Sequence, residues 1–307
     1  MGLGKPMKWW MKIGAFKALS LTPGGSALYR WFQENITGSL VPTSERVAQK
    51  IDVGLRYYRF LQSAQAETLL SNGRHVDIGS GWHPTIPLLF YCLGCHAQTL
   101  ADVVPVMTGK TASQTSATFG KIVLAGRYPE LQAERLARLG TLSWKDWPPR
   151  ELGWEYRAPY MGWLAEQSSA LDLATSTQAL LHVPRGVLAS IFRLVHQSLK
   201  PGGFFLATVH LRDLFADADP GITPYNHLRY SPWVWDRLIC SSLMSYNRLK
   251  APDYRHLLLE AGFKIREFQV DPGQPDLLEK IQIHPCFRSY SQEDLSAFHL
   301  FWAAQKS

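Results

Sequence analysis

Val76-Asp77-Ile78-Gly79-Ser80-Gly81 is the stretch of this 307-residue chain from which the fold can be argued. It lies where a short apolar strand, predicted over residues 74–78, gives way to a helix predicted over residues 84–93. Glycines at such a junction allow a tight backbone turn and the close approach of a ligand. A strand, a glycine turn and a helix in this order are typical of a parallel α/β sheet.

Two kinds of cofactor use a turn of this shape, and the neighbouring residues distinguish them. A dinucleotide-binding turn has a third glycine three residues after the second, where this chain has Pro84. Asp77, two residues before the first glycine, would repel a pyrophosphate but suits a ligand that carries an ammonium group. The turn therefore argues against an NAD-dependent oxidoreductase.

Asp77, Gly79 and Gly81 form the pattern acid, any residue, Gly, any residue, Gly. This pattern resembles the first motif of the class I S-adenosylmethionine (SAM)-dependent methyltransferases, with His83 in place of their usual third glycine. The resemblance implies that Asp77 helps to hold the methionine amino group and that Gly79, Ser80 and Gly81 line the cofactor. The cofactor would be SAM, and S-adenosylhomocysteine would be its product.

Further residues of the cofactor site are expected at the ends of two other strands. Asp102 ends a predicted second strand over residues 99–104, and a carboxylate there can accept hydrogen bonds from both ribose hydroxyls. The alternative for Asp102 is a helix cap. The remaining residues that the resemblance implies for the cofactor are Val103, Thr175, Ser176 and Gln178.

The rest of the chain continues the alternation of strands and helices. Strands are predicted near 154–158 and over 171–176, 204–210, 263–270 and 297–303, and helices over 187–199 and 253–261. The expected fold is an α/β, Rossmann-like, seven-stranded, mostly parallel sheet with helices on both faces. An N-terminal helical cap (1–70) would precede the methyltransferase domain (71–307). Near the third strand, residues 156–159 offer no acid where the family usually contacts adenine.

Residues 211–255 form an irregular, aromatic and polar insertion after the fifth strand, typical of a lid or binding loop. We call these residues the lid. The acceptor-binding residues expected there are Tyr225, Asn226, Arg229, Asn247 and Arg248. Arginines would suit a carboxylate or phosphate on the acceptor. Alternatively, Arg229 and Arg248 pair with acids at 213, 236 or 253 and pin the lid.

Three histidines are candidate general bases if the acceptor is a hydroxyl, whose proton must be removed. His210 ends the fifth strand and is the first choice, His182 follows the fourth strand, and His227 lies in the lid. The alternative for each is a histidine whose hydrogen bonds are satisfied in the core.

Composition narrows the class of protein. A hydrophobic fraction of 46% and a charged fraction of 19% are ordinary for a folded soluble chain. The net charge is +7, but no run of five Lys or Arg occurs. Residues 175–178 also lack the Asn/Asp-Pro-Pro-aromatic motif of many base methyltransferases. No nucleic acid is therefore expected as a partner. Cys92 and Cys95 lack the second pair that a zinc ribbon needs, so no metal is expected. The four cysteines of the chain do not resemble a disulfide framework, which favours a reducing cytoplasm.

The N-terminal segment allows two interpretations. It contains Lys5, Lys8, Trp9, Trp10, Met11, Lys12, Phe16 and Lys17. Such a helix can lie on a lipid surface or pack on its own domain.

The predicted function is transfer of a methyl group to a small-molecule acceptor, through a hydroxyl oxygen, by in-line displacement. The alternatives are a lipid or lipid-linked acceptor at a membrane surface, and a methyltransferase fold that binds without catalysis.

Overall fold

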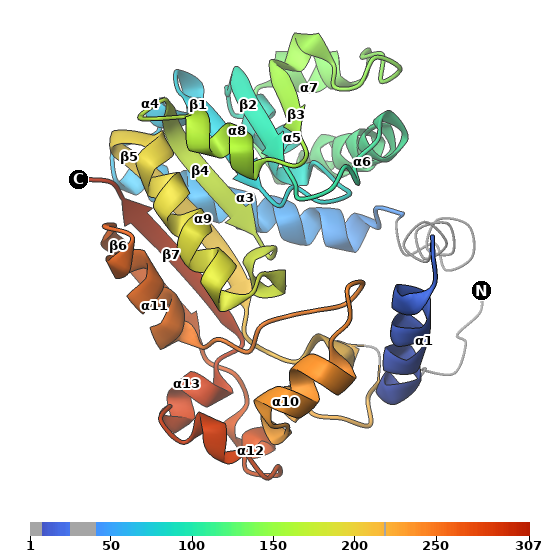
Figure 1. Ribbon diagram of the computed structural model, residues 1–307. Helices are drawn as coiled ribbons and strands as arrows, with labels where there is room; N and C mark the ends of the chain where they lie inside the picture. Colours follow the sequence, from blue (N-terminus) through green and yellow to red (C-terminus); the bar gives the residue numbers. More distant parts are fainter. Residues whose placement is uncertain (1–7, 25–40, 218) are drawn as a thin grey trace.

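The computed structural model describes residues 8–24, 41–217 and 219–307. Its centre is one seven-stranded sheet with the strand order β3-β2-β1-β4-β5-β7-β6 (Figure 1). The strands are β1 (Arg74–Ile78), β2 (Ala97–Ala101), β3 (Trp154–Arg157), β4 (Leu171–Thr177), β5 (Leu199–His210), β6 (Lys264–Asp271) and β7 (His299–Gln305). The first five strands run parallel, and β7 is antiparallel to both β5 and β6. The predicted mostly parallel seven-stranded sheet is confirmed.

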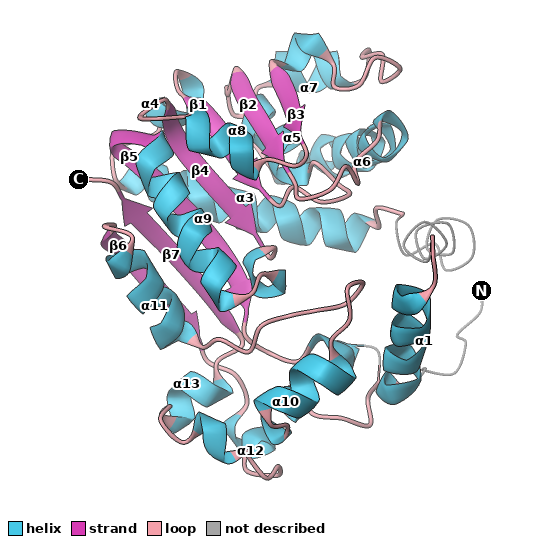
Figure 2. Ribbon diagram, viewed as in Figure 1, coloured by secondary structure: helices cyan, strands magenta, loops and turns pink. Residues whose placement is uncertain are grey.

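Helices cover both faces of this sheet, as a buried parallel sheet requires (Figure 2). One face carries α3 (Ser44–Ser63), α4 (Thr68–Ser71), α5 (Thr85–Cys92), α6 (Gly109–Ile122) and α7 (Ala133–Leu139). The other carries α8 (Met161–Glu166), α9 (Arg185–Ser198) and α11 (Ala251–Glu260). Two separate hydrophobic clusters, one on each side, form the core.

The predicted elements lie within a few residues of the observed ones. The strand over 74–78 matches β1, and the helix predicted over 187–199 is α9, over 185–198. The second strand is β2 over 97–101, so that it ends one residue before Asp102. A strand also occurs at the poorly marked third position, as β3.

Helix α3 belongs to the core of the sheet. Its N-terminus is capped by the Thr43 hydroxyl, which accepts from the Arg46 amide. A Cβ atom at Gly54 would lie 2.4 Å from Leu89 Cδ2 of α5, so the glycine allows the two helices to pack closely. Anchored in this way, α3 places its N-terminal half beside the carboxyl ends of β4 and β5.

Helix α1 (Trp9–Leu21) packs against the lid instead. The Trp9 ring lies 6.2 Å from Phe215 and 5.8 Å from Tyr230, and its amide donates to Asp219 at 3.0 Å. Lys5 lies outside the described residues. No helix in the described part of the chain is long and apolar enough to cross a bilayer.

The lid is built from short turns and α10 (Pro232–Val234), and its irregular part ends where α11 begins at Ala251. A second insertion, between β6 and β7, packs against the lid and contains α12 (Pro275–Leu278) and α13 (Gln292–Ser296). Tyr225 and Leu228 of the lid form a small hydrophobic cluster with Leu278 and Leu295 of this insertion. The lid is therefore fixed from two sides.

Candidate functional site

The turn after β1 has the geometry that its glycines suggest. Gly79 and Gly81 adopt φ of +74° and +68°, a left-handed conformation that side chains rarely take. A Cβ at Gly79 would lie 2.2 Å from the Cβ of Ala179, so the chain after β4 approaches the turn closely. Over Gly81 the nearest atom would be 3.9 Å away, the carbonyl oxygen of Gly79. The turn therefore offers open space on the side of Gly81.

Asp77 lies beneath this turn and is only 4% exposed. The Thr175 hydroxyl donates to its carboxylate at 2.8 Å, while Ser80 and Ser176 donate at 2.8 Å to the carbonyl oxygens of Asp77 and Ile78. Burial raises the pKa of Asp77, and the hydrogen bond from Thr175 opposes that shift. The three hydroxyls thus position the turn and the carboxylate.

Asp102 lies on the other side of the turn. Both of its carboxylate oxygens are near the Gly81 amide, at 3.1 and 3.2 Å, and the Tyr156 hydroxyl donates to it at 3.3 Å. Burial raises the pKa of Asp102 to about 7, against the hydrogen bond from Gly81. Because α6 begins only at Gly109, Asp102 caps no helix. Its neighbour Val103 is 65% exposed.

Tyr156 is a member of this site that the sequence did not reveal. It lies on β3, and its hydroxyl accepts from the amides of Val106 and Met107 at 2.9 and 3.2 Å while it donates to Asp102. It thereby connects the third strand to the end of the second. No local signal marks this contact, because it joins residues 54 positions apart.

The residues around the turn fit an aminoacyl nucleoside such as SAM. Two buried carboxylates flank an open glycine turn, and neither forms a salt bridge with a described residue. Asp77 can hold an ammonium group, and Asp102 can accept from ribose hydroxyls. The structure brings these groups together at the carboxyl ends of β1 and β2, where ligands of open α/β sheets bind.

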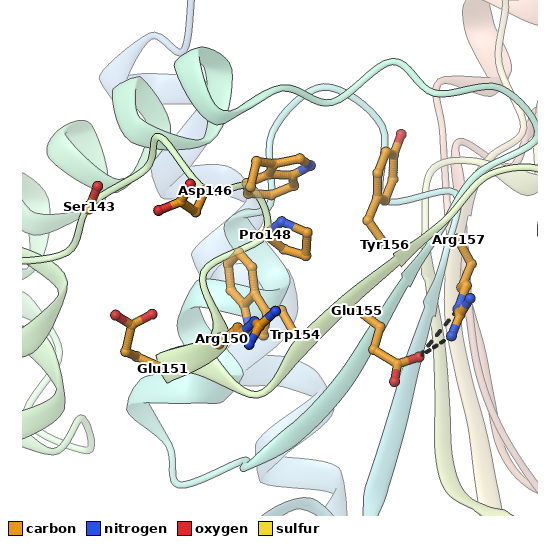
Figure 3. Close-up of a pocket in the computed structure, with 10 residues that line it drawn as sticks. Ser143, Asp146, Pro148, Arg150, Glu151, Trp154, Glu155, Tyr156 and Arg157 are labelled. Atoms are coloured by element: carbon orange, nitrogen blue, oxygen red, sulfur yellow. Dashed lines mark hydrogen bonds and ion pairs between the residues drawn. The ribbon is translucent and has the colours of Figure 1, made fainter.

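A cavity of about 890 Å³ borders the edge strand β3 (Figure 3). Its lining includes Trp154, Tyr156 and Arg157 but neither Asp77 nor Asp102, so it meets the site only at Tyr156. Its polar contact is the ion pair of Glu155 and Arg157, 3.0 Å apart (Figure 3). Size alone therefore does not identify the site.

A second cavity, of about 650 Å³, adjoins the glycine turn. It lies between α3 and the carboxyl ends of β4 and β5, and we call it the α3 pocket. Its lining includes His83 and Thr85, directly after the turn, together with Gln178 and His210. Gln178 adopts φ of +58°, which turns the chain at the end of β4. The α3 pocket therefore borders residues that follow β1 and residues at the carboxyl ends of β4 and β5.

His210, the first candidate base, lines the α3 pocket at the end of β5. Its Nδ1 atom is buried and has no hydrogen-bond partner among the described residues. Burial lowers the pKa of His210 to about 3, and the neighbouring His299, whose ring is 4.7 Å away, acts in the same direction. The imidazole is therefore neutral at pH 7. His182 is bonded to the Ser245 carbonyl at 2.7 Å and does not line this pocket.

The acceptor-binding residues predicted in the lid do not line the α3 pocket. Tyr225 is fully buried and donates to the Ser296 carbonyl at 2.8 Å. Asn226 is 2% exposed, and His227 lies 3.2 Å from the buried ammonium of Lys250. These three side chains therefore hold the lid together rather than face an acceptor.

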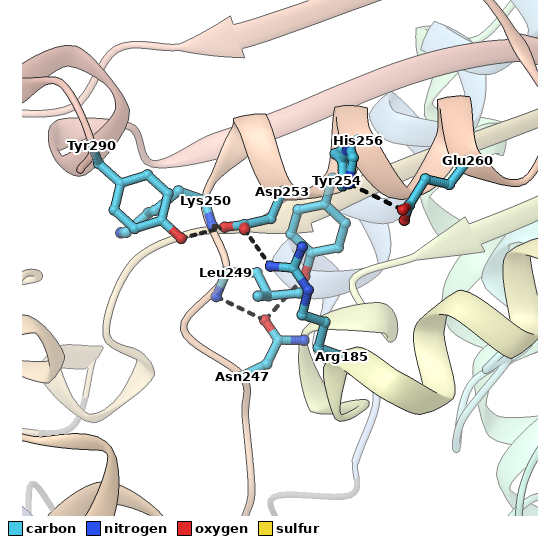
Figure 4. A network of polar contacts seen from close by, with 9 residues as sticks. All are labelled: Arg185, Asn247, Leu249, Lys250, Asp253, Tyr254, His256, Glu260 and Tyr290. Carbon is cyan, nitrogen blue, oxygen red and sulfur yellow. Dashed lines mark hydrogen bonds and ion pairs between the residues drawn. The ribbon is translucent and has the colours of Figure 1, made fainter. Parts of the chain in front are cut away.

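Asn247 and Arg248 also act within the lid. The Asn247 amide donates to the carbonyls of Leu180 and Val183 at 3.0 and 2.7 Å, and its oxygen accepts from the Leu249 amide (Figure 4). Arg248 donates to the His227 carbonyl at 3.1 Å and lies over the rings of Trp235 and Phe287, at 5.1 and 4.9 Å. It pins the lid through carbonyls and rings, not through acids, while Arg229 is exposed.

Comparison with known proteins gives one decisive match. Residues 52–267, more than two thirds of the chain, match the family model described as a methyltransferase domain. The matched range contains the glycine turn, Asp102 and His210. No curated protein is significantly similar to the chain in sequence.

Solved structures are similar at a low level. A magnesium protoporphyrin IX methyltransferase from Synechocystis with bound S-adenosylhomocysteine is 13% identical, with a TM-score of 0.45, over 92% of this chain and 95% of that one. A SAM-dependent methyltransferase from Methanosarcina mazei is 16% identical, with a TM-score of 0.42, over 76% and 92%. One from Mesorhizobium loti is 18% identical, with a TM-score of 0.38, over 79% and 97%.

Proposed function

This chain belongs to the methyltransferase domain family and is a SAM-dependent methyltransferase; on that premise we propose that it methylates a small molecule, bound in the α3 pocket, through a hydroxyl oxygen. The observation that carries the proposal is the position of this pocket, which adjoins the glycine turn and is lined by His210. When bound, SAM supplies a methyl group activated by its sulfonium. The chain's own residues must then hold both partners in line and accept a proton.

The cofactor side of this proposal is assigned to the two acids and the open turn. Asp77, kept in place by Thr175, holds the ammonium group, and Asp102 accepts from the ribose hydroxyls. Gly81 leaves room for the ligand, since no atom would lie within 3.9 Å of a Cβ there. Gln178, on the positive-φ turn after β4, borders both the cofactor and the acceptor.

The acceptor side is assigned to His210. Its imidazole is neutral at pH 7 because burial lowers its pKa to about 3, so it is available to accept a hydrogen bond from a hydroxyl. As methyl transfer proceeds, the hydroxyl becomes more acidic and its proton passes to the ring.

Calorimetry with SAM and S-adenosylhomocysteine tests the cofactor assignment. Both should bind to the protein, and Asp102→Ala should weaken binding at least tenfold, because a buried acceptor of two hydroxyls is lost. Asp276→Ala is the matched control, because Asp276 is an exposed acid on α12, outside the glycine turn. Absence of binding at millimolar concentration would mean a fold that has lost its cofactor. Unchanged binding in both Asp77→Ala and Asp102→Ala would remove the site assignment.

His210→Gln tests the proposed base. The turnover number of the oxygen-methylating reaction should fall by about 10²- to 10⁴-fold, the usual contribution of a general base, with SAM affinity unchanged. His256→Gln serves as control, because His256 is exposed on α11 and pairs with Glu260 at 3.1 Å. Equal turnover of the two variants would exclude His210 as the base.

A membrane-presented acceptor is a second candidate, favoured by one observation. Trp9 of α1 is packed on the lid, but Trp10 and Met11 are 60% and 48% exposed, next to Lys8 and Lys12. Such a face suits an anionic bilayer. Co-sedimentation with phosphatidylserine vesicles should fall several-fold in Trp10→Ser, and equal sedimentation of the variant would argue against this candidate.

A further inference from the structure

The α3 pocket is lined unevenly in charge. Its lining contains the cationic side chains Arg46, Lys50, Arg56 and Arg212 and the single carboxylate Asp271. Asp271 lies 3.9 Å from His299, and Arg212 is already paired with Asp217, which is outside the lining, at 2.5 Å. The excess of positive charge therefore comes from α3.

The cationic residues of α3 form one face of the helix. Arg46, Lys50, Val53 and Arg56 all line the pocket and are spaced as successive turns of one helical face. The opposite face, with Ile51 among its residues, is buried in the core. Because α3 packs closely on α5 at Gly54, it presents these charges to the pocket as a fixed row.

Lys50 stands at the junction between the pocket and the cofactor turn. Its charge interacts with both Asp77 and Asp102, yet its ammonium group donates no hydrogen bond to any described residue. Burial lowers the pKa of Lys50, and burial together with the charges of Lys50 and Arg46 lowers that of His83 to about 4. A partly desolvated ammonium without a bonded anion is costly, and an anionic ligand would offset that cost.

The sheet side of the pocket also has unsatisfied polar groups. Thr85 Oγ1, Gln178 Oε1 and His210 Nδ1 are buried and lack hydrogen-bond partners among the described residues. Such groups in a folded interior usually have partners. Three of them around one cavity indicate a polar ligand rather than an apolar one.

We infer that the methyl acceptor carries an anionic group, a carboxylate or a phosphate, and that Arg46 and Lys50 bind it. This inference rests on the proposed function, because it takes the α3 pocket as the acceptor site. A guanidinium can bind either anion through two parallel hydrogen bonds, and the ammonium adds a point charge beside it. The anion would anchor the acceptor on α3, with its nucleophilic atom directed toward His210 and the cofactor turn.

Anion binding can be measured without knowing the natural acceptor. Benzoate, its neutral isostere benzamide and inorganic phosphate are titrated by NMR into the full-length protein saturated with S-adenosylhomocysteine, at constant ionic strength. Benzoate and phosphate should bind at least tenfold more tightly than benzamide. The double variant Arg46→Gln/Lys50→Gln should reduce anion affinity at least tenfold and leave benzamide unchanged.

The matched control is Arg59→Gln on the same helix. Arg59 pairs with Glu130 at 3.7 Å and does not line the pocket, so this variant should change anion affinity less than twofold. Melting curves of all variants verify that they are folded.

Two results would overturn the inference: benzamide binding as tightly as benzoate, or anion affinity unchanged in the double variant. If Lys50→Gln weakens S-adenosylhomocysteine but not benzoate, Lys50 serves the cofactor carboxylate and its assignment to the acceptor is wrong. Failure of the wild-type protein to bind S-adenosylhomocysteine contradicts the proposed function separately. The benzoate and benzamide titrations, repeated without it, then still decide whether the pocket selects anions.

Discussion

Helix α3 and the lid are both rich in polar side chains, but they differ in whether those side chains have hydrogen-bond partners within the protein. In the lid, the fully buried Asp213 accepts from the Phe215 amide at 2.8 Å and from the Tyr246 hydroxyl at 2.6 Å. On α3, the Lys50 ammonium donates to no described residue and lines a pocket beside the cofactor turn. Polar composition therefore does not distinguish a binding surface, and the α3 pocket is identified instead by three buried polar atoms of its lining that lack partners among the described residues.

The difference has a simple origin in the backbone. A helix such as α3 satisfies its main-chain groups internally, so its side chains can serve another purpose. The lid has little regular structure, and its buried carbonyls and amides need partners from elsewhere. Asn247 and Arg248 supply such partners, because both donate to main-chain carbonyls.

The largest expected effect concerns the aromatic centre of the lid. Trp235 is 2% exposed and donates to the Tyr246 carbonyl at 3.0 Å. Trp235→Ala should lower the free energy of unfolding by about 3–5 kcal/mol, measured by urea denaturation. Trp233→Ala, at a side chain 64% exposed, should change it by less than about 0.5 kcal/mol. Similar values for both would mean that the lid is not a packed structure.

A second effect concerns pH. Burial raises the pKa of Asp213 to about 6, above its ordinary value of 3.8. The folded state therefore binds the Asp213 proton more tightly than the unfolded state does. The resulting contribution to the free energy of unfolding is fully present below pH 4 and is lost as the pH rises through 6. Asp213→Asn removes this dependence.

The free energy of unfolding of Asp213→Asn minus that of the wild-type protein should accordingly increase by about 3 kcal/mol between pH 3.5 and pH 7. Differential scanning calorimetry of both proteins across this range measures it. A difference that is constant with pH would contradict the raised pKa.

Replacement of Arg248 in the lid and of Arg46 on α3 should have opposite effects on stability and on anion binding. Arg248→Gln should lower the free energy of unfolding by about 2 kcal/mol, since it leaves buried carbonyls without a charged donor. It should leave benzoate affinity unchanged. Arg46→Gln should do the reverse, with little loss of stability and a loss of anion binding. The inverse pattern would make the lid the acceptor site.

The smallest effect is expected at Arg229, which is exposed in the lid. Arg229→Ala should change the free energy of unfolding by less than about 0.5 kcal/mol and leave anion affinity within twofold. Thermal melting and the benzoate titration measure the two quantities. A clear loss of anion binding would restore Arg229 as an acceptor contact.

Much of the fold could be predicted because its signals are local. The glycine turn, the apolar strands and the helices between them each occupy a short stretch of sequence, and parallel strands place their carboxyl ends at one edge. Asp77, Asp102 and His210 are therefore expected at the same edge. The contact of Tyr156 with Asp102, and the support of the lid by α12 and α13, join distant segments and leave no local pattern.

The acceptor side was predicted less well for the same reason. The spacing of Arg46, Lys50 and Arg56 on one helical face is visible in the sequence, but whether that face meets solvent or a pocket is not. In the lid, the abundance of polar residues indicated binding, while most of those residues satisfy the lid's own buried groups. Satisfaction of hydrogen bonds is a property of the assembled fold.

The parallel α/β sheet, the glycine turn and the edge at which ligands meet it follow from local sequence, because hydrophobic periodicity and glycine conformation act over a few residues. Which polar side chains form hydrogen bonds within the fold, and which face a cavity, depends on the assembled chain. That choice depends on packing between α3, the sheet and the lid, whose contacts lie far apart along the chain.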